Sequence, residues 1–135
     1  MLEIKPIESK SEQEEILARC GIPYKETLFA YKAYEAGELL AAAQFDIGGS
    51  EAELDAIRQV IGTPEDFEGM FILGRAVLNF LDLCGVETVI SCSENDEERR
   101  LLRCIGFRDE GDCLRVTLKG LFDGHCSGNG SCQNG

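Results

Sequence analysis

The fold of this chain is decided by residues 63–92, which read TPEDFEGMFILGRAVLNFLDLCGVETVISC. The pair Thr63-Pro64 is typical of a helix N-cap followed by the first helical position, and Gly85 is typical of a helix end. Between them, apolar residues recur at intervals of three and four, so we expect one long helix with a buried face. The β-branched run after the glycine predicts a short strand over 87–92.

A second strand-like run, over 51–60, precedes this helix. When a helix connects two strands of one sheet, it carries the chain back across the sheet, so that the second strand runs in the same direction as the first. We therefore expect the strands over 51–60 and 87–92 to lie parallel and to splay apart at their C-terminal ends.

Apolar periodicity and turn residues predict the other elements on either side of this unit. Before the long helix we expect a strand over 2–7, a helix with a capping box at Ser11 and Glu14 that ends at Gly21, and an antiparallel meander of strands over 28–34, 39–47 and 51–60. After it we expect a helix that begins at Asn95, with Glu98 as capping partner, and ends at Gly106, and then a strand over 113–118. The resulting order, β-α-β-β-β-α-β-α-β, predicts an α/β (α+β) fold with a mixed sheet and flanking helices.

The length of 135 residues leaves room for one domain, which we expect to cover residues 1–122. The last residues, 123–135, are rich in glycine and contain no large apolar side chain, so they are expected to form a flexible tail.

The chain is strongly acidic, with a formal net charge of −12. This charge argues against nucleic acid as a partner and against docking on an anionic membrane, since both interactions depend on Lys and Arg. The apolar runs are too short to span a membrane, and the N-terminus lacks the apolar core of a secretory signal, so we expect a cytoplasmic protein.

The seven cysteines of the chain are expected to be reduced in such a compartment. Cys20, Cys84, Cys92 and Cys104 fall within apolar or helical patterns, where a free cysteine behaves as a small apolar residue.

Two segments carry a family resemblance: GRAVLNFLDLCGVETVISCSEN at 74–95 and LLRCIGFRDEG at 101–111. They resemble the core of the GNAT family of N-acetyltransferases, in which a glycine-rich turn enters a helix with G-x-A-L-L and is followed by an Asn and by L-Y-x-x-x-G-F. The resemblance extends over about residues 1–122 and implies a GNAT-like mixed sheet. It also implies that acetyl-CoA is the cosubstrate and that an amine, on a small molecule or a peptide, accepts the acetyl group.

The same resemblance suggests the cofactor-binding residues. It places the backbone amides of Leu73, Gly74 and Arg75 at the pyrophosphate and the side chain of Asn95 at the pantetheine arm. Asn95 has a second interpretation, because an Asn followed by Glu98 is also typical of a helix cap.

The chain departs from the family pattern at the phosphate loop and at one side chain. Gly69 stands where the family has Arg or Gln, and Ile72 stands where it has a glycine that lets the backbone approach a phosphate. Acidic residues before Gly69 would also repel phosphate. Leu102 occupies the position of a tyrosine that can protonate the leaving thiolate, and leucine cannot donate a proton.

The candidate general bases are Glu53 and Asp55, on the strand over 51–60. As an alternative, both are simply solvent-facing residues of an acidic strand. A basic cluster within the C-terminal part is likewise open to two interpretations, neutralising neighbouring acids or binding the 3′-phosphate of coenzyme A. It consists of Arg99, Arg100, Arg103 and Arg108.

A further set of metal-ligand types lies towards the C-terminus. Cys113, His125, Cys126 and Cys132 would together offer three thiolates and one imidazole, a known zinc set. Their spacing matches no common zinc motif, so no metal site is predicted and a reduced tail is favoured over metal binding or a disulfide.

The sequence thus favours an acetyl-CoA-dependent N-acetyltransferase. The first alternative is a GNAT-shaped binding or assembly module that has lost catalysis, and the second is a metal or thiol function of the Cys-containing tail. The oligomeric state is left open, a dimer included.

Overall fold

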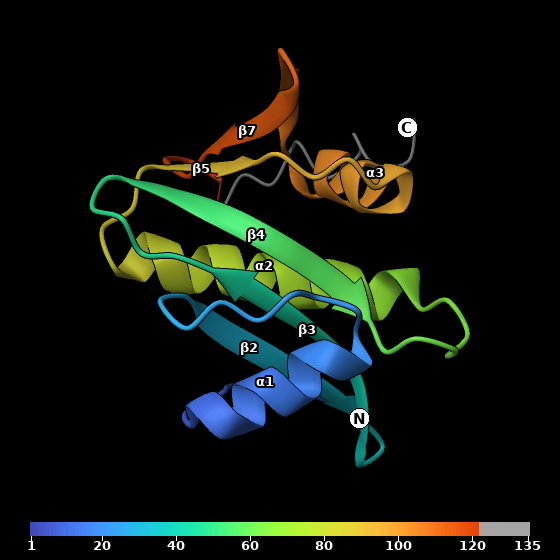
Figure 1. Ribbon diagram of the computed structural model, residues 1–135. Helices are drawn as coiled ribbons and strands as arrows, with labels where there is room; N and C mark the ends of the chain where they lie inside the picture. Colours follow the sequence, from blue (N-terminus) through green and yellow to red (C-terminus); the bar gives the residue numbers. More distant parts are fainter. Residues whose placement is uncertain (122–135) are drawn as a thin grey trace.

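The computed structural model describes residues 1–121, which form a seven-stranded mixed sheet with three helices (Figure 1). The strands follow one another across the sheet in the order β1-β2-β3-β4-β5-β7-β6. In chain order the elements are β1 (Leu2–Pro6), α1 (Lys10–Arg19), β2 (Phe29–Glu35), β3 (Glu38–Phe45), β4 (Glu51–Gln59), α2 (Phe67–Leu83), β5 (Thr88–Ser91), α3 (Asp96–Ile105), β6 (Arg108–Glu110) and β7 (Cys113–Thr117).

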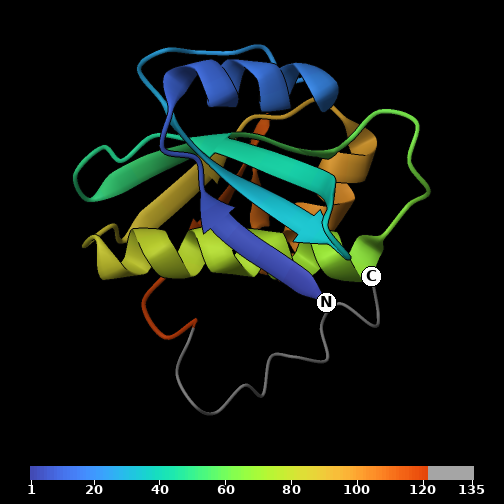
Figure 2. The same ribbon diagram turned by 90° about the horizontal axis from the view of Figure 1, so that it is seen from below.

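The helices cover both faces of the sheet, and each face has its own apolar core. Helix α1 lies on one side of the strands and α2 on the other, as Figure 2 shows from below. The larger core lies between the sheet, α2 and α3, where the side chains of Phe45, Leu54 and Leu78 are almost fully buried. The smaller core lies under α1 and includes Ile16 and Leu17.

The strand topology confirms the expected crossover. Strands β2, β3 and β4 form an antiparallel meander, and β4 and β5 pair in parallel on either side of α2 in the chain. The parallel ladder contains three residue pairs and ends at Glu53 and Ile90, whereas β4 continues to Gln59. The expected divergence of the two strands is therefore present at their C-terminal ends.

Both of the first two helices begin at residues other than those expected. Helix α1 is capped by Ser9, whose hydroxyl accepts a hydrogen bond from the Glu12 amide, and not by Ser11. Helix α2 is capped by Asp66, whose carboxylate accepts from the Gly69 amide at 2.9 Å, and not by Thr63.

The side chain of Gln59 explains the late start of α2. Its carboxamide nitrogen donates to the Thr63 hydroxyl and to the Pro64 carbonyl, and its oxygen accepts from the Asp66 amide at 2.7 Å. These bonds hold residues 63–66 as a loop against the end of β4, which accounts for the start of the helix at Phe67.

The C-terminal part contains one strand more than expected. Strand β6 pairs antiparallel with β7 in a tight hairpin, and Gly111 adopts a positive φ of 66° at its turn. Such a backbone conformation favours glycine, because a Cβ atom would be strained there.

The expectation of free, buried cysteines is correct only in part. Cys20 is free and buried, but Cys84 is free and exposed, and Cys92 is joined to Cys113 by a disulfide. Cys92 follows β5 and Cys113 begins β7, and β5 and β7 are neighbouring antiparallel strands. The pairing of β5 with β7 brings the two sulfur atoms together, and the sequence around each cysteine does not indicate this pairing.

Two further expectations concern the C-terminal tail and membrane-spanning helices. The tail expected over 123–135, with His125, Cys126 and Cys132, lies outside the described residues. Within residues 1–121, no helix combines the length and the apolar character needed to cross a membrane.

Gly74 lies where α2 crosses α3. It is buried in the interior of α2, and a Cβ atom added to it would lie 2.3 Å from Cδ1 of Ile105. The glycine therefore allows the two helices to approach closely, which accounts for its place in the middle of a helix.

We predict that Gly74→Ala destabilises the protein only while the Ile105 Cδ1 atom is present. In the natural background, overpacking of about 1–3 kcal/mol should outweigh the gain in helix propensity and lower the free energy of unfolding. Ile105→Val removes the clashing methyl group, so in that background Gly74→Ala should be neutral or stabilising by up to about 1 kcal/mol. Urea denaturation of the four proteins of this cycle measures the difference, and an equal cost in both backgrounds would contradict the packing argument.

Candidate functional site

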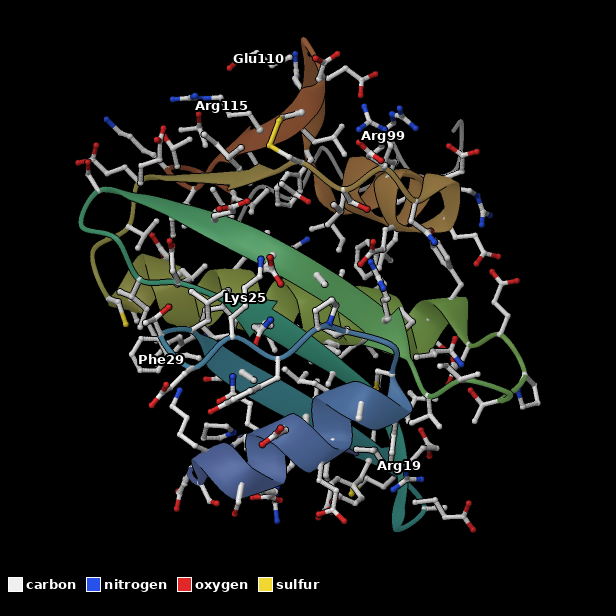
Figure 3. The ribbon with its side chains drawn as sticks, in the orientation of Figure 1. Arg19, Lys25, Phe29, Arg99, Glu110 and Arg115 are labelled. Carbon is white, nitrogen blue, oxygen red and sulfur yellow. A yellow bond between two sulfur atoms is a disulfide. The ribbon has the colours of Figure 1, made fainter. Side chains whose placement is uncertain are left out.

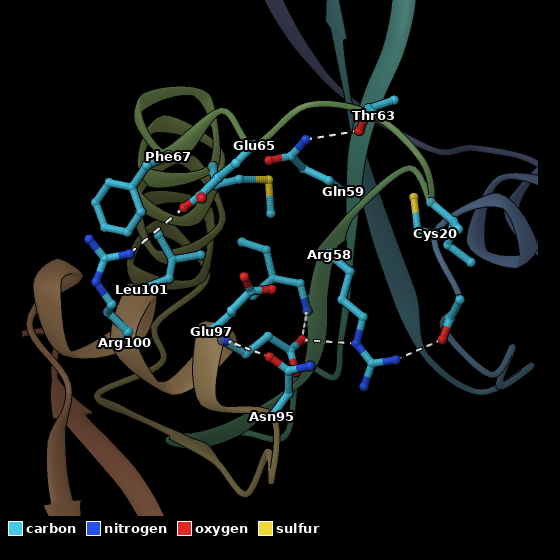
Figure 4. A pocket seen from close by; sticks show the side chains of 15 residues that line it. Cys20, Arg58, Gln59, Thr63, Glu65, Phe67, Asn95, Glu97, Arg100 and Leu101 are labelled. Atoms are coloured by element: carbon cyan, nitrogen blue, oxygen red, sulfur yellow. Dashed lines mark hydrogen bonds and ion pairs between the residues drawn. The ribbon is translucent and has the colours of Figure 1, made fainter.

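The candidate site is a pocket beside the open edge of β4, where β5 has already diverged (Figure 4). It has a volume of about 500 Å³ and lies between the end of β4, the loop before α2, and the first turns of α2 and α3. Its lining combines apolar side chains with charged and polar ones. The charged and polar lining residues are Arg58, Gln59, Thr63, Glu65, Asn95, Glu97, Glu98 and Arg100.

The carboxylate of Glu98 organises this pocket. Glu98 is only 4% exposed, and its Oε2 accepts a hydrogen bond of 2.8 Å from the backbone amide of Ile57 in β4. The same oxygen faces Nε of Arg58 at 3.3 Å, and Oε1 accepts from the Ser93 hydroxyl at 2.5 Å. A side chain of α3 thus supplies the acceptor that a neighbouring strand would supply if β5 were longer.

Two arginines connect the pocket to its surroundings. Arg58 donates to the carbonyl of Gly21 at 2.7 Å, so it joins β4 to the end of α1 (Figure 4). Arg100 lies over the ring of Phe67, 4.7 Å from its centroid, and faces Glu65 at 3.8 Å. The arginines therefore lie across the junctions between elements that enclose the pocket.

The basic cluster of α3 pairs with acids outside its own first turn. Arg99 and Arg103 both face Asp109 of β6, at 3.6 Å and 3.2 Å. Arg100 faces Glu65 of the loop before α2. These arginines therefore do neutralise acids, but acids of β6 and of that loop, and not Asp96, Glu97 and Glu98 as expected.

The structure places Leu73, Gly74 and Arg75 in the interior of α2. The helix begins at Phe67, and the amides of Gly69 and Met70 already bond to Asp66. Residues this far into an α-helix donate their backbone amides to carbonyls of the preceding turn. Met70 lines the pocket, whereas Leu73, Gly74 and Arg75 are not among its lining residues.

The two candidate bases lie on β4 but outside the pocket. Glu53 is exposed, at the last residue pair between β4 and β5. Asp55 faces Lys25 at 2.6 Å and accepts from the Gln44 carboxamide at 2.9 Å. The hydrogen bond to Asp55, together with the charge of this carboxylate, raises the pKa of Lys25 above its ordinary value.

Among the residues that the resemblance assigns to acetyl-CoA and the two candidate bases, Asn95 alone lines the pocket. Its side-chain oxygen accepts from the Glu98 amide at 2.9 Å, so the expected helix cap is present at the same position. Leu102 of α3, at the position of the family's tyrosine, is fully buried in the larger core.

The thiol of Cys20 is a further group of the pocket. Cys20 lines the pocket, but burial raises the pKa of its thiol to about 11, so it is protonated and a poor nucleophile at neutral pH. Within residues 1–121, no group of three or more His, Cys, Asp or Glu side chains is arranged to hold a metal ion.

The central residue of the pocket, Glu98, was predicted only as a capping partner. A signal for its burial exists in the sequence, because Leu101, Leu102 and Ile105 follow it at three, four and seven residues. This spacing places an acid on the apolar face of a helix, which is typical of a carboxylate with a buried partner.

We predict that Glu98→Ala lowers the free energy of unfolding by about 3 kcal/mol, because it leaves the Ile57 amide without its acceptor and Arg58 without its charge partner. The matched control is Glu97→Ala in the same helical turn, where an exposed carboxylate is removed and a change within about 0.5 kcal/mol is expected. Chemical denaturation measures both values. Equal effects of the two substitutions would show that the buried contact does not stabilise the fold.

Comparison with known proteins adds the fold family. No protein-family model and no curated protein matches the sequence. Among solved structures, a ribosomal-protein alanine N-acetyltransferase from Escherichia coli matches with a TM-score of 0.67 and 17% identity, over 87% of this chain and 94% of the other. A Bacillus subtilis acetyltransferase in complex with CoA matches with a TM-score of 0.66 and 14% identity, over 87% of this chain and 99% of the other. A GNAT family acetyltransferase from Brucella melitensis in complex with acetyl-CoA matches with a TM-score of 0.63 and 13% identity, over 87% of this chain and 88% of the other.

These matches extend over most of each chain. Together with the seven-stranded mixed sheet and its parallel pair β4 and β5, they show that the chain has the fold of the GNAT acetyltransferases.

Proposed function

We propose that the protein is an N-acetyltransferase that transfers the acetyl group of acetyl-CoA to an amine of a small molecule or a peptide. The observation that carries this proposal is the open edge of β4 beside a pocket of about 500 Å³. Solved proteins of the same fold hold CoA or acetyl-CoA, which supports the choice of cosubstrate.

In this proposal the acyl-pantetheine arm lies along the open edge of β4. The amide of Ile57 would then donate to the thioester carbonyl, which stabilises the negative charge that develops on this oxygen during attack by the amine. Asn95 lines the same pocket and would contact the arm. Because Glu98 already accepts from this amide, its carboxylate has to move aside before the thioester binds.

Glu53 is the better candidate for the general base. Its carboxylate is exposed and can take a proton from an ammonium group directly or through water. Asp55 is the second candidate, but Lys25 and the carboxamide of Gln44 already occupy its oxygens. The net charge of −12 would favour the approach of a cationic amine.

The phosphate end of the cofactor is the weak part of the proposed complex. Leu73, Gly74 and Arg75 could contact it only if the first turns of α2 unwound, since their amides belong to the helix. In the helical state, phosphates would meet the first turn of α2, where Glu68 adds a negative charge. We therefore expect the affinity to come from the pantetheine arm, with little from the phosphates.

A binding or assembly module without turnover is the second candidate. It is favoured by two specific contacts, the Asp66 cap on the Gly69 amide and the Glu98 carboxylate on the Ile57 amide. In a protein that binds no cofactor these contacts need no rearrangement. The two candidates differ in one measurable property, the binding of acetyl-CoA.

We predict weak acetyl-CoA binding, with a dissociation constant between the micromolar and the millimolar range. Each phosphate contact that is lost removes about 1.5–3 kcal/mol, which corresponds to orders of magnitude in affinity. Glu68→Gln should strengthen binding by about fivefold because it removes one like charge at the start of α2. Glu87→Gln is the matched control, since Glu87 is an exposed acid before β5, and it should leave the affinity unchanged.

Calorimetry measures binding, and release of the CoA thiol in the presence of a panel of amines measures turnover. Glu53→Gln should abolish thiol release while leaving the affinity for acetyl-CoA unchanged. Binding without thiol release for any amine would favour the module, and the absence of binding at millimolar acetyl-CoA would overturn the acetyltransferase proposal.

A further inference from the structure

The disulfide between Cys92 and Cys113 lies at the point where the ladder between β5 and β7 ends. The last registered pair of this ladder is Ser91 with Leu114, so the disulfide joins the next residue on each side (Figure 3). Beyond it, the chain leaves the sheet and runs through Ser93 to the start of α3. The covalent bond therefore fixes the residue that directly follows β5, before the chain turns towards the pocket.

Arg99 forms a second tether across the same place. Its Nη1 donates to the carbonyl of Ser93 at 2.8 Å and to the carbonyl of Asp112 at 3.2 Å. Ser93 follows Cys92 in the chain and Asp112 precedes Cys113, so one guanidinium holds the neighbours of both sulfur atoms. The disulfide and Arg99 thus constrain the same two segments by independent means.

This tethered segment leads directly to the buried carboxylate of the pocket. The Ser93 hydroxyl donates to Oε1 of Glu98 and also accepts from the Asn95 amide at 3.1 Å. The other oxygen of Glu98 accepts from the Ile57 amide on β4. A chain of short contacts therefore runs from the disulfide through Ser93 and Glu98 to the open edge of β4.

The disulfide lies between residues that are at least partly exposed. Cys92 is exposed and Cys113 is half-buried. An exposed disulfide exchanges with small thiols more readily than one sealed in a core, because the attacking thiolate has to reach a sulfur atom. Cys20, by contrast, is buried, and its raised pKa keeps it out of such exchange.

We propose that Cys92 and Cys113 form a reversible redox latch that controls the contact between Glu98 and the Ile57 amide. In the oxidised state, the latch holds Ser93 and the start of α3 in place, and Glu98 stays on the amide. In the reduced state the covalent tie is lost and only hydrogen bonds, those of Arg99 among them, hold the segment, so the contact opens more often and the edge of β4 becomes available. This control does not depend on the proposed acetyl transfer.

The chemistry is an ordinary exchange with a low-molecular-weight disulfide such as glutathione disulfide. The Cys92 thiolate attacks one sulfur of glutathione disulfide, forms a mixed disulfide and releases one glutathione thiolate. The Cys113 thiolate then attacks the sulfur of Cys92 and releases the second glutathione thiolate, and the two protons of the protein thiols end on glutathione. Two protein thiols are oxidised and one glutathione disulfide is reduced to two thiols.

The test uses the full chain, labelled with ¹⁵N, in glutathione buffers of different thiol-to-disulfide ratio and without CoA. Alkylation and digestion after Lys, Arg and Glu separate Cys84 from Cys92, because Glu87 lies between them. We expect Cys92 and Cys113 to be linked in the oxidising buffer and free in the reducing one. Hydrogen exchange of the Ile57 amide should be faster in the reduced protein by about fivefold, the factor expected when a typical hydrogen bond is weakened.

Three variants make the test specific. The double variant Cys92→Ser, Cys113→Ser should show the fast exchange of the Ile57 amide in both buffers, whereas Cys84→Ser should switch as the natural protein does. Arg99→Gln removes the second tether, so reduction should then accelerate exchange by more than in the natural protein. The amide of Ala42, in the centre of β3, serves as the internal control and should not respond.

Each contrary result would overturn the proposal. Cys92 and Cys113 could remain thiols in the most oxidising buffer, or either could be linked to another cysteine, Cys126 and Cys132 included. The Ile57 amide could also exchange at the same rate in both redox states. Failure of acetyl-CoA to bind has no bearing on these measurements, so the latch and the acetyltransferase proposal stand or fall separately.

Discussion

The burial of one face of α2 against the sheet is the constraint on which the rest of the structure depends. Met70, Leu73, Val77, Leu78 and Leu81 are buried on this face, and each large apolar side chain contributes about 1.5–3 kcal/mol when it leaves water. The helix therefore has to lie across the sheet between β4 and β5, which makes these strands parallel. Because β5 is short, the end of β4 pairs with β3 on one side but has no strand on the other, and the buried amide on that open side needs another acceptor. Glu98 provides that acceptor from α3.

The fold could be predicted largely from the sequence, because its signals are local and repeated. The apolar periodicity of α2 and the run of strands after Phe29 predict the antiparallel meander and the parallel pairing of β4 with β5, whereas β6 and the position of β7 in the sheet were not predicted. The start of α2 could not be predicted, since Thr63-Pro64 is a good local helix start and the side chain of Gln59, from β4, holds that stretch as a loop through a tertiary contact. Cys92 and Cys113 illustrate the same limit, because their pairing depends on β5 and β7 being neighbours.

The candidate site was less predictable than the fold, for a physical reason. Resemblance draws attention to residues that bind a ligand in relatives, and it identified Asn95 and the stretch around Gly74. It does not describe contacts that are particular to this chain. Glu98 has its role because α3 brings it to the Ile57 amide. Asp55 is held by hydrogen bonds from Lys25 and Gln44, which lie on other segments of the chain. Gly74 itself has a packing explanation, since Ile105 fills the space beside it.

In the proposed complex, stability and ligand binding compete at the amide of Ile57, because this amide already donates to Glu98. A hydrogen bond to a charged group contributes about 1.5–3 kcal/mol, so a thioester carbonyl that replaces Glu98 has to overcome a cost of roughly tenfold or more in affinity. The displaced carboxylate, however, keeps Arg58 and the Ser93 hydroxyl as partners, so it need not become an isolated buried charge. The cost of opening therefore depends on how firmly Ser93 and the start of α3 are held. In the proposed latch, whatever loosens that segment lowers the cost at the Ile57 amide. The junction of β5, β7 and α3, and not the pocket lining alone, would then set how open the site is.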